Sequence, residues 1–174
     1  MNMELPVRTA SELMDAGFEA RWAERHAARR DDVLQRILRL FLERGGPIAP
    51  DALAAALPGR PPAEVGDALR RLDADDLVFL REGQVELAYP FAAGPNSFQV
   101  ALEDGRERYA CCAIDALGLA PMVGQRLTVR TYCHQSGTPL VFPVTPEGPG
   151  PEAAGIMVWV GPRPEGAAKA CTSL

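Results

Sequence analysis

Apolar residues in the first half of the chain recur at the spacing of helices. After Asp31, a residue type that caps helices, they lie three and four positions apart until Gly45 and Gly46, namely at Val33, Leu34, Ile37, Leu38, Phe41 and Leu42. Two further helices are predicted from Pro50 to Leu57 and from Ala63 to Leu72, on either side of a turn at Pro58 to Pro62. Residues 1–30 mix charged residues with alanine, and we expect a helical extension there.

Two short runs of alternating apolar residues follow these helices. The runs Leu77 to Leu80 and Gln84 to Ala88 predict two strands joined by a tight turn at Glu82-Gly83. Three helices followed by a hairpin is the pattern of a winged helix. We therefore predict a winged-helix-like domain over residues 31–89.

Beyond residue 89 the pattern changes to short β-type runs separated by Gly and Pro. The predicted strands are Ser97 to Leu102, Gln125 to Tyr132, Leu140 to Val144 and Gly155 to Val160. One helix-length segment interrupts them, from Cys112 to Ala120, ended by Pro121 and Gly124. The expected fold class is α+β: the winged-helix-like unit, then a mainly antiparallel β-sheet domain over residues 90–174 with a cysteine-bearing helix.

The charge of the chain argues against nucleic acid as a partner. The net charge is -5, whereas proteins that bind phosphate backbones usually carry a concentrated positive field. The segment that would serve as a recognition helix, Pro62 to Arg71, carries two acidic residues against two arginines. A DNA-binding role does not follow from the winged-helix pattern alone.

The cysteines are expected to be reduced. No run approaches the roughly 18 consecutive apolar residues that span a bilayer, and the N-terminus lacks the basic stretch and apolar core of an export signal. We therefore expect a cytoplasmic protein with no membrane partner. The four cysteines, Cys111, Cys112, Cys133 and Cys171, are then thiols that react with electrophiles or bind soft metals.

Cys112 and Asp115 form the best candidate for chemistry. They are three residues apart at the start of a predicted helix, so their side chains share one face. A helix N-terminus favours the thiolate, which is expected to lower the pKa of Cys112 and make it a nucleophile. Near that charge, in an apolar pocket, the pKa of the Asp115 carboxyl is expected to rise, so that it holds a proton for delivery. The same spacing also fits a buried structural cysteine and a solvated first-turn aspartate.

The other candidates are less well placed. Cys111 would point away from Cys112 on a helix, and Cys133-His134 at a strand end fits a structural role. His26 and His134 are the only histidines, too few for a His-based zinc site, and no glycine-rich phosphate loop is present. We expect no organic cofactor.

Three motifs in this region resemble the core of the alkylmercury (organomercurial) lyase family. They are a Tyr-Ala-x-Cys-Ala-x-Asp helix start from Tyr109 to Asp115, a Pro-to-Gly exit at Pro121 to Gly124, and a Cys-x-x-x-Gly-x-Pro strand and turn from Cys133 to Pro139. The family also has a winged-helix-like N-terminal part. The resemblance therefore covers about residues 31–160 and is strongest over residues 108–146.

The resemblance implies cleavage of a carbon–mercury bond by protonolysis, which gives a hydrocarbon and Hg(II). Cys112 and Asp115 match the mercury-binding cysteine and the proton-handling aspartate of the family, and Cys133 matches a cysteine considered structural. Cys171 falls at about the distance of the second mercury-binding cysteine. The implied catalytic and mercury-binding residues are thus Cys112, Asp115 and Cys171. The implied partners are an organomercurial small molecule, Hg(II), and external thiols or a mercury-accepting reductase.

Two alternatives remain open from the sequence. The chain could be a winged-helix transcriptional regulator that senses metal through Cys111, Cys112 or Cys133. It could also be a mercury-binding relative that leaves the carbon–mercury bond intact.

Overall fold

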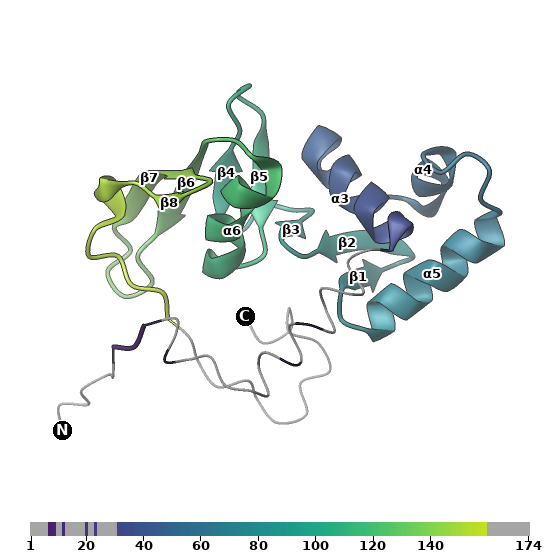
Figure 1. Ribbon diagram of the computed structural model, residues 1–174, viewed down its shortest axis with the longest axis horizontal. Helices are drawn as coiled ribbons and strands as arrows, with labels where there is room; N and C mark the ends of the chain where they lie inside the picture. The colour runs from purple at the N-terminus through teal and green to yellow at the C-terminus, as the bar shows by residue number, and fades with distance from the viewer. Residues whose placement is uncertain (1–6, 10–11, 13–19, 21–22, 24–30, 160–174) are drawn as a thin grey trace.

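The computed structural model describes residues 7–9, 12, 20, 23 and 31–159. Helices α3, α4 and α5 gather at one end of the described molecule, and strands β6, β7 and β8 lie at the other (Figure 1). The predicted extension over residues 1–30 falls almost wholly outside the described residues.

Helix α3 (Asp32–Arg44) follows from the pattern of the sequence. The Asp31 side chain accepts hydrogen bonds from the backbone N–H groups of Val33 at 2.8 Å and Leu34 at 3.2 Å. Gly45 ends the helix at φ 80°, a conformation that glycine adopts without strain. The predicted helix and both of its ends are confirmed, and its buried stripe is Val33, Leu34, Ile37, Leu40 and Phe41.

The next elements also lie close to their predicted positions. Helices α4 (Pro50–Ala55) and α5 (Pro62–Ala74) precede a hairpin of β1 (Val78–Arg81) and β2 (Gln84–Ala88). Both helices begin with proline, whose fixed φ suits the first helical position. The hairpin turn takes φ 52° at Glu82 and 78° at Gly83, the two positive φ values of a type I′ turn.

The strands form one sheet in the order β1-β2-β3-β5-β4-β6-β7-β8, and every neighbouring pair is antiparallel. The described residues therefore combine helices with an antiparallel sheet. The strands beyond the hairpin are β3 (Phe91–Ala92), β4 (Gln99–Ala101), β5 (Glu107–Ala110), β6 (Leu127–Tyr132), β7 (Pro139–Thr145) and β8 (Gly148–Pro149).

One predicted strand is wrong over its described part. Residues 155–159 have no strand structure, although Gly155 to Val160 has a strand-like composition. A short 3₁₀ helix, η1 (Pro151–Ala153), precedes them, and the Ile156 N–H bonds back to the Ala153 carbonyl at 3.0 Å. A backbone group that closes a local turn cannot also pair with a neighbouring strand.

Helix α6 (Ala113–Val123) packs against β5, β6, β7 and β8. The sequence predicts that Pro121 and Gly124 end this helix; Gly124 is its C-cap, whereas Pro121 lies inside the helix, which continues to Val123. The reason is that the Gly124 N–H bonds to the Ala120 carbonyl at 2.9 Å and Gly124 adopts φ 68°. The last turn therefore closes without the N–H group that proline lacks.

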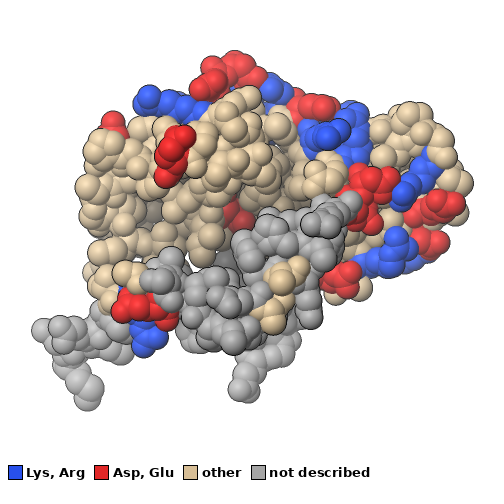
Figure 2. Space-filling view, viewed as in Figure 1, with Lys and Arg blue, Asp and Glu red and all other residues tan. Residues whose placement is uncertain are grey.

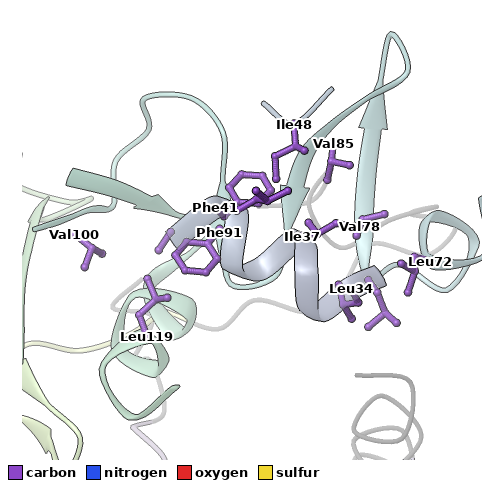
Figure 3. Close-up of a cluster of buried hydrophobic side chains, with 14 of the residues drawn as sticks. Leu34, Ile37, Phe41, Ile48, Leu72, Val78, Val85, Phe91, Val100 and Leu119 are labelled. Atoms are coloured by element: carbon purple, nitrogen blue, oxygen red, sulfur yellow. The ribbon is translucent and has the colours of Figure 1, made fainter. Parts of the chain in front are cut away.

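One hydrophobic core connects the two ends of the described molecule. Phe41 of α3 and Phe91 of β3 stack with ring centroids 5.8 Å apart. Figure 3 shows Leu119 of α6 on the side of Phe91 that faces away from Phe41. The predicted domain boundary after residue 89 falls between β2 and β3, which pair with each other. The division into domains 31–89 and 90–174 stays a prediction.

Charged side chains are unevenly distributed over the face shown in Figure 2. They gather over the helices at the right and along the upper edge, whereas the surface at the left, over α6 and β6 to β8, carries few. In the part of the chain that the structure describes, no helix is both long enough and apolar enough to cross a membrane.

Candidate functional site

Hydrogen bonds from two other segments hold the corner between β5 and α6. The side-chain amide of Asn96 donates to the Ala110 carbonyl at 2.7 Å. The backbone N–H of Cys111 donates to the Pro90 carbonyl at 3.0 Å. Because these bonds fix the chain just before Cys112, that residue enters α6 from a defined direction.

Cys112 caps the N-terminus of α6. Its backbone is extended, with φ -148° and ψ -178°, and its carbonyl accepts the first helical hydrogen bond, from the Ala116 N–H at 2.9 Å. The Cys112 sulfur lies 3.1 Å from Oδ2 of Asp115, to which the thiol donates a hydrogen bond. The two side chains meet, as their three-residue spacing predicts.

The prediction that the helix N-terminus lowers the pKa of Cys112 is wrong. Burial, and then the charge of the neighbouring Asp115, raise the pKa of the Cys112 thiol from 9.0 to about 11. Both effects disfavour the thiolate. The backbone N–H groups of Asp115 and Ile114 do lower this pKa, as a helix N-terminus should, but their effect is smaller. The sulfur therefore keeps its proton at neutral pH.

The resting pair is a thiol that donates to a carboxylate. One proton lies between sulfur and oxygen, and the sulfur becomes strongly nucleophilic when this proton moves to the carboxylate. Such a pair suits a soft electrophile, because the sulfur can bond to the electrophile while the carboxyl keeps the proton nearby.

A cavity of about 810 Å³ lies beside α6. Ala113, Ala116 and Leu117 form part of its wall, while Cys112 and Asp115 are their sequence neighbours and do not themselves line it. The rest of the described wall is mostly apolar and suits an apolar group. It includes Phe98, Phe142, Ile156, Met157 and Trp159.

Cys133 also lines this cavity, a position that the sequence does not reveal. It is partly exposed and follows the last residue of β6. Hydrogen bonds from the Ser136 side chain, the Ser136 backbone and the Gln135 backbone lower the pKa of its thiol. Val129 and Thr131 of β6 line the cavity as well, and so do Tyr132 and His134 on either side of Cys133, so the alternation of side chains along the strand does not by itself place this thiol.

His134 also lines the cavity; the other candidates are either not described by the structure or lie outside the cavity wall. Cys171 and His26 lie outside the described residues. Cys111 is partly exposed and is not in the cavity wall. Among residues 31–159 and the few described before them, no three His, Cys, Asp or Glu side chains form a group that could hold a metal ion.

Comparisons with known sequences point in one direction. Residues 91–174 match the model of the MerB alkylmercury lyase family. An alkylmercury lyase of Staphylococcus epidermidis is 30% identical over 115 residues, which are 66% of this chain and 50% of that protein. Alkylmercury lyases of Bacillus cereus and Clostridium butyricum are each 30% identical over 94 residues, 53% of this chain and 41% of theirs. The chain thus spans half or less of the length of these relatives.

A solved structure agrees at the level of the fold. The crystal structure of the mercury-bound form of MerB2 superposes with a TM-score of 0.58 and 17% sequence identity, over 72% of this chain and 63% of that one. The residues that match the family model include the corner that carries Cys112 and Asp115. Residues 91–174 thus match the alkylmercury lyase family, and the sequence relatives that the chain resembles are alkylmercury lyases.

Proposed function

We propose that this chain is an organomercurial lyase, which cleaves a carbon–mercury bond to give a hydrocarbon and Hg(II). The observation that carries the proposal is the 3.1 Å contact between the Cys112 sulfur and the Asp115 carboxylate. Hg(II) is a soft ion that prefers thiolates. Replacement of its carbon ligand by sulfur needs a proton at carbon, and this pair holds one.

In the first step, the Cys112 sulfur bonds to mercury in an R-Hg-X substrate. The thiol proton passes to Asp115 and X leaves as an anion, so that charge and atoms balance. Mercury binds to the sulfur before the carbon receives a proton. The reason is that the pKa of about 11 keeps the proton on the Cys112 sulfur until mercury displaces it. Mercury is thus bound at the moment when Asp115 becomes an acid.

In the second step, Asp115 returns the proton to the departing carbon. The carbon–mercury bond breaks, a carbon–hydrogen bond forms, and mercury stays on sulfur as Hg(II) without a change of oxidation state. We propose Cys171 as the second mercury-binding thiol. The Hg(II) then passes to external thiols or to a mercury-accepting reductase.

We also propose that residues 31–89 form a winged-helix-like unit that supports a lyase-like domain at residues 90–174, and that the protein acts in the cytoplasm. Arg70 of α5 forms an ion pair with Asp67 of the same helix, which leaves less positive charge on this unit for a nucleic acid. The matches reported above are to lyases, and they do not favour the transcriptional regulator.

The test is to mix the protein with a phenylmercury salt and an excess of a small thiol, and to measure benzene by gas chromatography. We expect benzene above the thiol-only background. Cys112→Ser and Asp115→Asn should each lower the rate by at least about 100-fold, the usual contribution of a proton-transfer group or nucleophile.

Cys111→Ser is the matched control, since it removes the adjacent thiol and leaves the Cys112–Asp115 pair in place. It should keep most of the activity. Cys171→Ser tests the second thiol separately. No benzene above background from the wild-type protein would remove the enzymatic proposal.

A further inference from the structure

The end of β6 brings a second thiol to the cavity beside α6. Side chains of a strand alternate between its two faces, and Val129, Thr131 and Cys133 continue one face along β6 into the cavity wall. Arg130, between them, is exposed and forms an ion pair with Glu107 at 3.2 Å. The cavity wall therefore contains a sulfur atom in addition to its apolar groups.

A closed turn holds Cys133 in place. Its N–H donates to the Thr138 carbonyl and its carbonyl accepts from the Gly137 N–H, both at 2.8 Å. Gly137 sits at φ 68°, which glycine adopts without strain. The Ser136 hydroxyl and the backbone N–H groups of Gln135 and Ser136 donate toward the sulfur. These donors suit a sulfur that carries negative charge.

Thr131 lines the same cavity and is a second, independent observation that points to a ligand there. Its side chain is only 9% exposed, and its hydroxyl oxygen is buried without a hydrogen-bond partner among the described residues. Buried hydroxyl groups are normally hydrogen-bonded. A polar atom of a ligand in the cavity, such as an anion bound to mercury, would supply the missing partner.

We propose that Cys133 is a capture thiol, which binds the organomercury cation first, with its organic group in the cavity, and then passes it to Cys112. The inference rests on the proposed function. The ligand class is an organomercury cation with an apolar group, because the thiol binds the soft metal and the side chains of Phe98, Phe142 and Trp159 surround the organic part.

The two transfers balance without an oxidant. In the first, Cys133 thiolate displaces X from R-Hg-X, which gives Cys133-S-Hg-R and free X anion. In the second, the Cys112 sulfur bonds to mercury, Cys133 leaves as thiolate, and the Cys112 proton moves to Asp115. The carbon–mercury bond survives both exchanges, and its cleavage follows as proposed above.

Binding without turnover tests the capture step. In a Cys112→Ser/Cys171→Ser background, one equivalent of phenylmercury is added and the modified peptide is identified by mass spectrometry. We expect an intact phenylmercury adduct on Cys133, and at least about tenfold weaker binding when Cys133→Ser is added to this background. Cys111→Ser in the same background is the control and should leave the affinity unchanged. An adduct mainly on Cys111 would overturn the proposal.

The unsubstituted protein gives a second measurement that does not depend on how the variants fold. A brief exposure to one equivalent of phenylmercury at low temperature should protect Cys133 from alkylation by iodoacetamide. Phenylmercury should protect Cys133 more strongly than methylmercury, because the cavity holds the larger apolar group. The protection by each reagent is compared after correction for its affinity for glutathione. Equal protection of all cysteines would contradict a capture site.

Kinetics separate this inference from the lyase proposal. Cys133→Ser should lower kcat/KM for phenylmercury while kcat stays near the wild-type value, since capture precedes chemistry. If the wild-type protein releases benzene but Cys133→Ser does so with an unchanged kcat/KM, the capture role fails and the lyase proposal stands. If Cys133 binds phenylmercury but no benzene forms, the lyase proposal fails and the binding site stands.

Discussion

Cys112 and Asp115 hold one exchangeable proton between them, and its position decides when the sulfur reacts. Burial and the carboxylate charge keep the proton on sulfur, with a pKa of about 11. At pH 7 only about 1 in 10⁴ molecules would carry the Cys112 thiolate. A thiophilic metal that displaces the proton changes this balance, whereas a weaker electrophile does not.

The first prediction concerns the carboxylate. Asp115→Asn removes the negative charge beside Cys112, so the pKa of the thiol should fall and its alkylation by iodoacetamide at pH 8 should become several-fold faster, while the proposed carbon–mercury cleavage should be lost. The rate is followed by mass spectrometry of the Cys112 peptide. Asp67→Asn, at an exposed position of α5, should leave the rate unchanged. Slower alkylation of Asp115→Asn would contradict the electrostatic explanation.

The second prediction concerns stability and pH. The folded pKa of Cys112 is about 11, above the ordinary value of 9.0 that it regains on unfolding. Below pH 9 both states keep the proton and the stabilisation is complete. Between pH 9 and about 11 the unfolded chain releases its proton first, so the free energy of unfolding falls as the pH rises. Urea denaturation at pH 8.5 and 10.5 should show a steeper fall for the wild type than for Cys112→Ser. Parallel falls would refute the raised pKa.

At the scale of elements, two arginines of the β4–β5 region join the sheet to the end of α3. Arg108 donates from Nε and Nη2 to the Leu42 carbonyl, at 2.9 and 2.6 Å, and Arg106 donates from Nη1 to the Glu43 carbonyl at 2.6 Å. Carbonyls in the last turn of a helix lack helical partners and carry partial negative charge. Strand β5, which leads directly to Cys112, is thereby tied to the N-terminal helices.

The third prediction follows from this connection. Arg108 is 7% exposed, and Arg108→Met should lower the free energy of unfolding by about 1–3 kcal/mol, since the Leu42 carbonyl loses two hydrogen bonds from this buried side chain. Arg130→Met is the matched control, because its exposed ion pair with Glu107 contributes about 0–1 kcal/mol. Chemical denaturation measures both, and equal losses would show that the contact to α3 is unimportant.

Local signals in the sequence predict the elements that local forces determine. The cap at Asp31, the glycine stop at Gly45 and the Glu82-Gly83 turn predict α3 and the hairpin correctly. The strands β3 and β8 have two residues each, too few to show alternation. Their pairing depends on neighbours that are distant in the sequence. The strand expected at Gly155 to Val160 fails over its described residues for the same reason, since composition does not supply a partner strand.

The candidate site also has features that the local sequence predicts and features that depend on the packing of distant elements. The contact between Cys112 and Asp115 is predictable because it needs only the three-residue spacing of one helical turn. The direction of the Cys112 pKa shift is not predictable from spacing, because burial by other elements outweighs the helix N-terminus. The place of Cys133 in the cavity wall also depends on how α6 packs on the sheet.

At the scale of the whole molecule, helix α6 and the N-terminal helices α3 to α5 share one hydrophobic core. Phe91 is 1% exposed and stacks on Phe41, which is fully buried, while α6 contributes Leu119 to the same cluster. Loss of packing on one side should therefore affect the other, and the described molecule should unfold in a single transition.

The fourth prediction tests this cooperativity. Phe91→Ala should lower the free energy of unfolding by about 3–5 kcal/mol, because it leaves a cavity in the core. Val141→Ala, at an exposed position, should change it by about 0.5 kcal/mol or less. In both variants, the urea midpoint from circular dichroism should coincide with the midpoint for exposure of Cys112 to alkylation. Separate midpoints would show that the two halves unfold independently.

The short strand β3 has a consequence for any fragment of this protein. It pairs with β2 on one side and with β5 on the other, and the match to the family model begins at its first residue, Phe91. A fragment cut at that residue would retain Cys112 and Asp115, yet it would present a bare strand edge and an uncovered aromatic ring to water. Such surfaces promote association between copies. The elements that precede β3 thus cover these surfaces and keep the segment that contains Cys112 and Asp115 from associating with other copies.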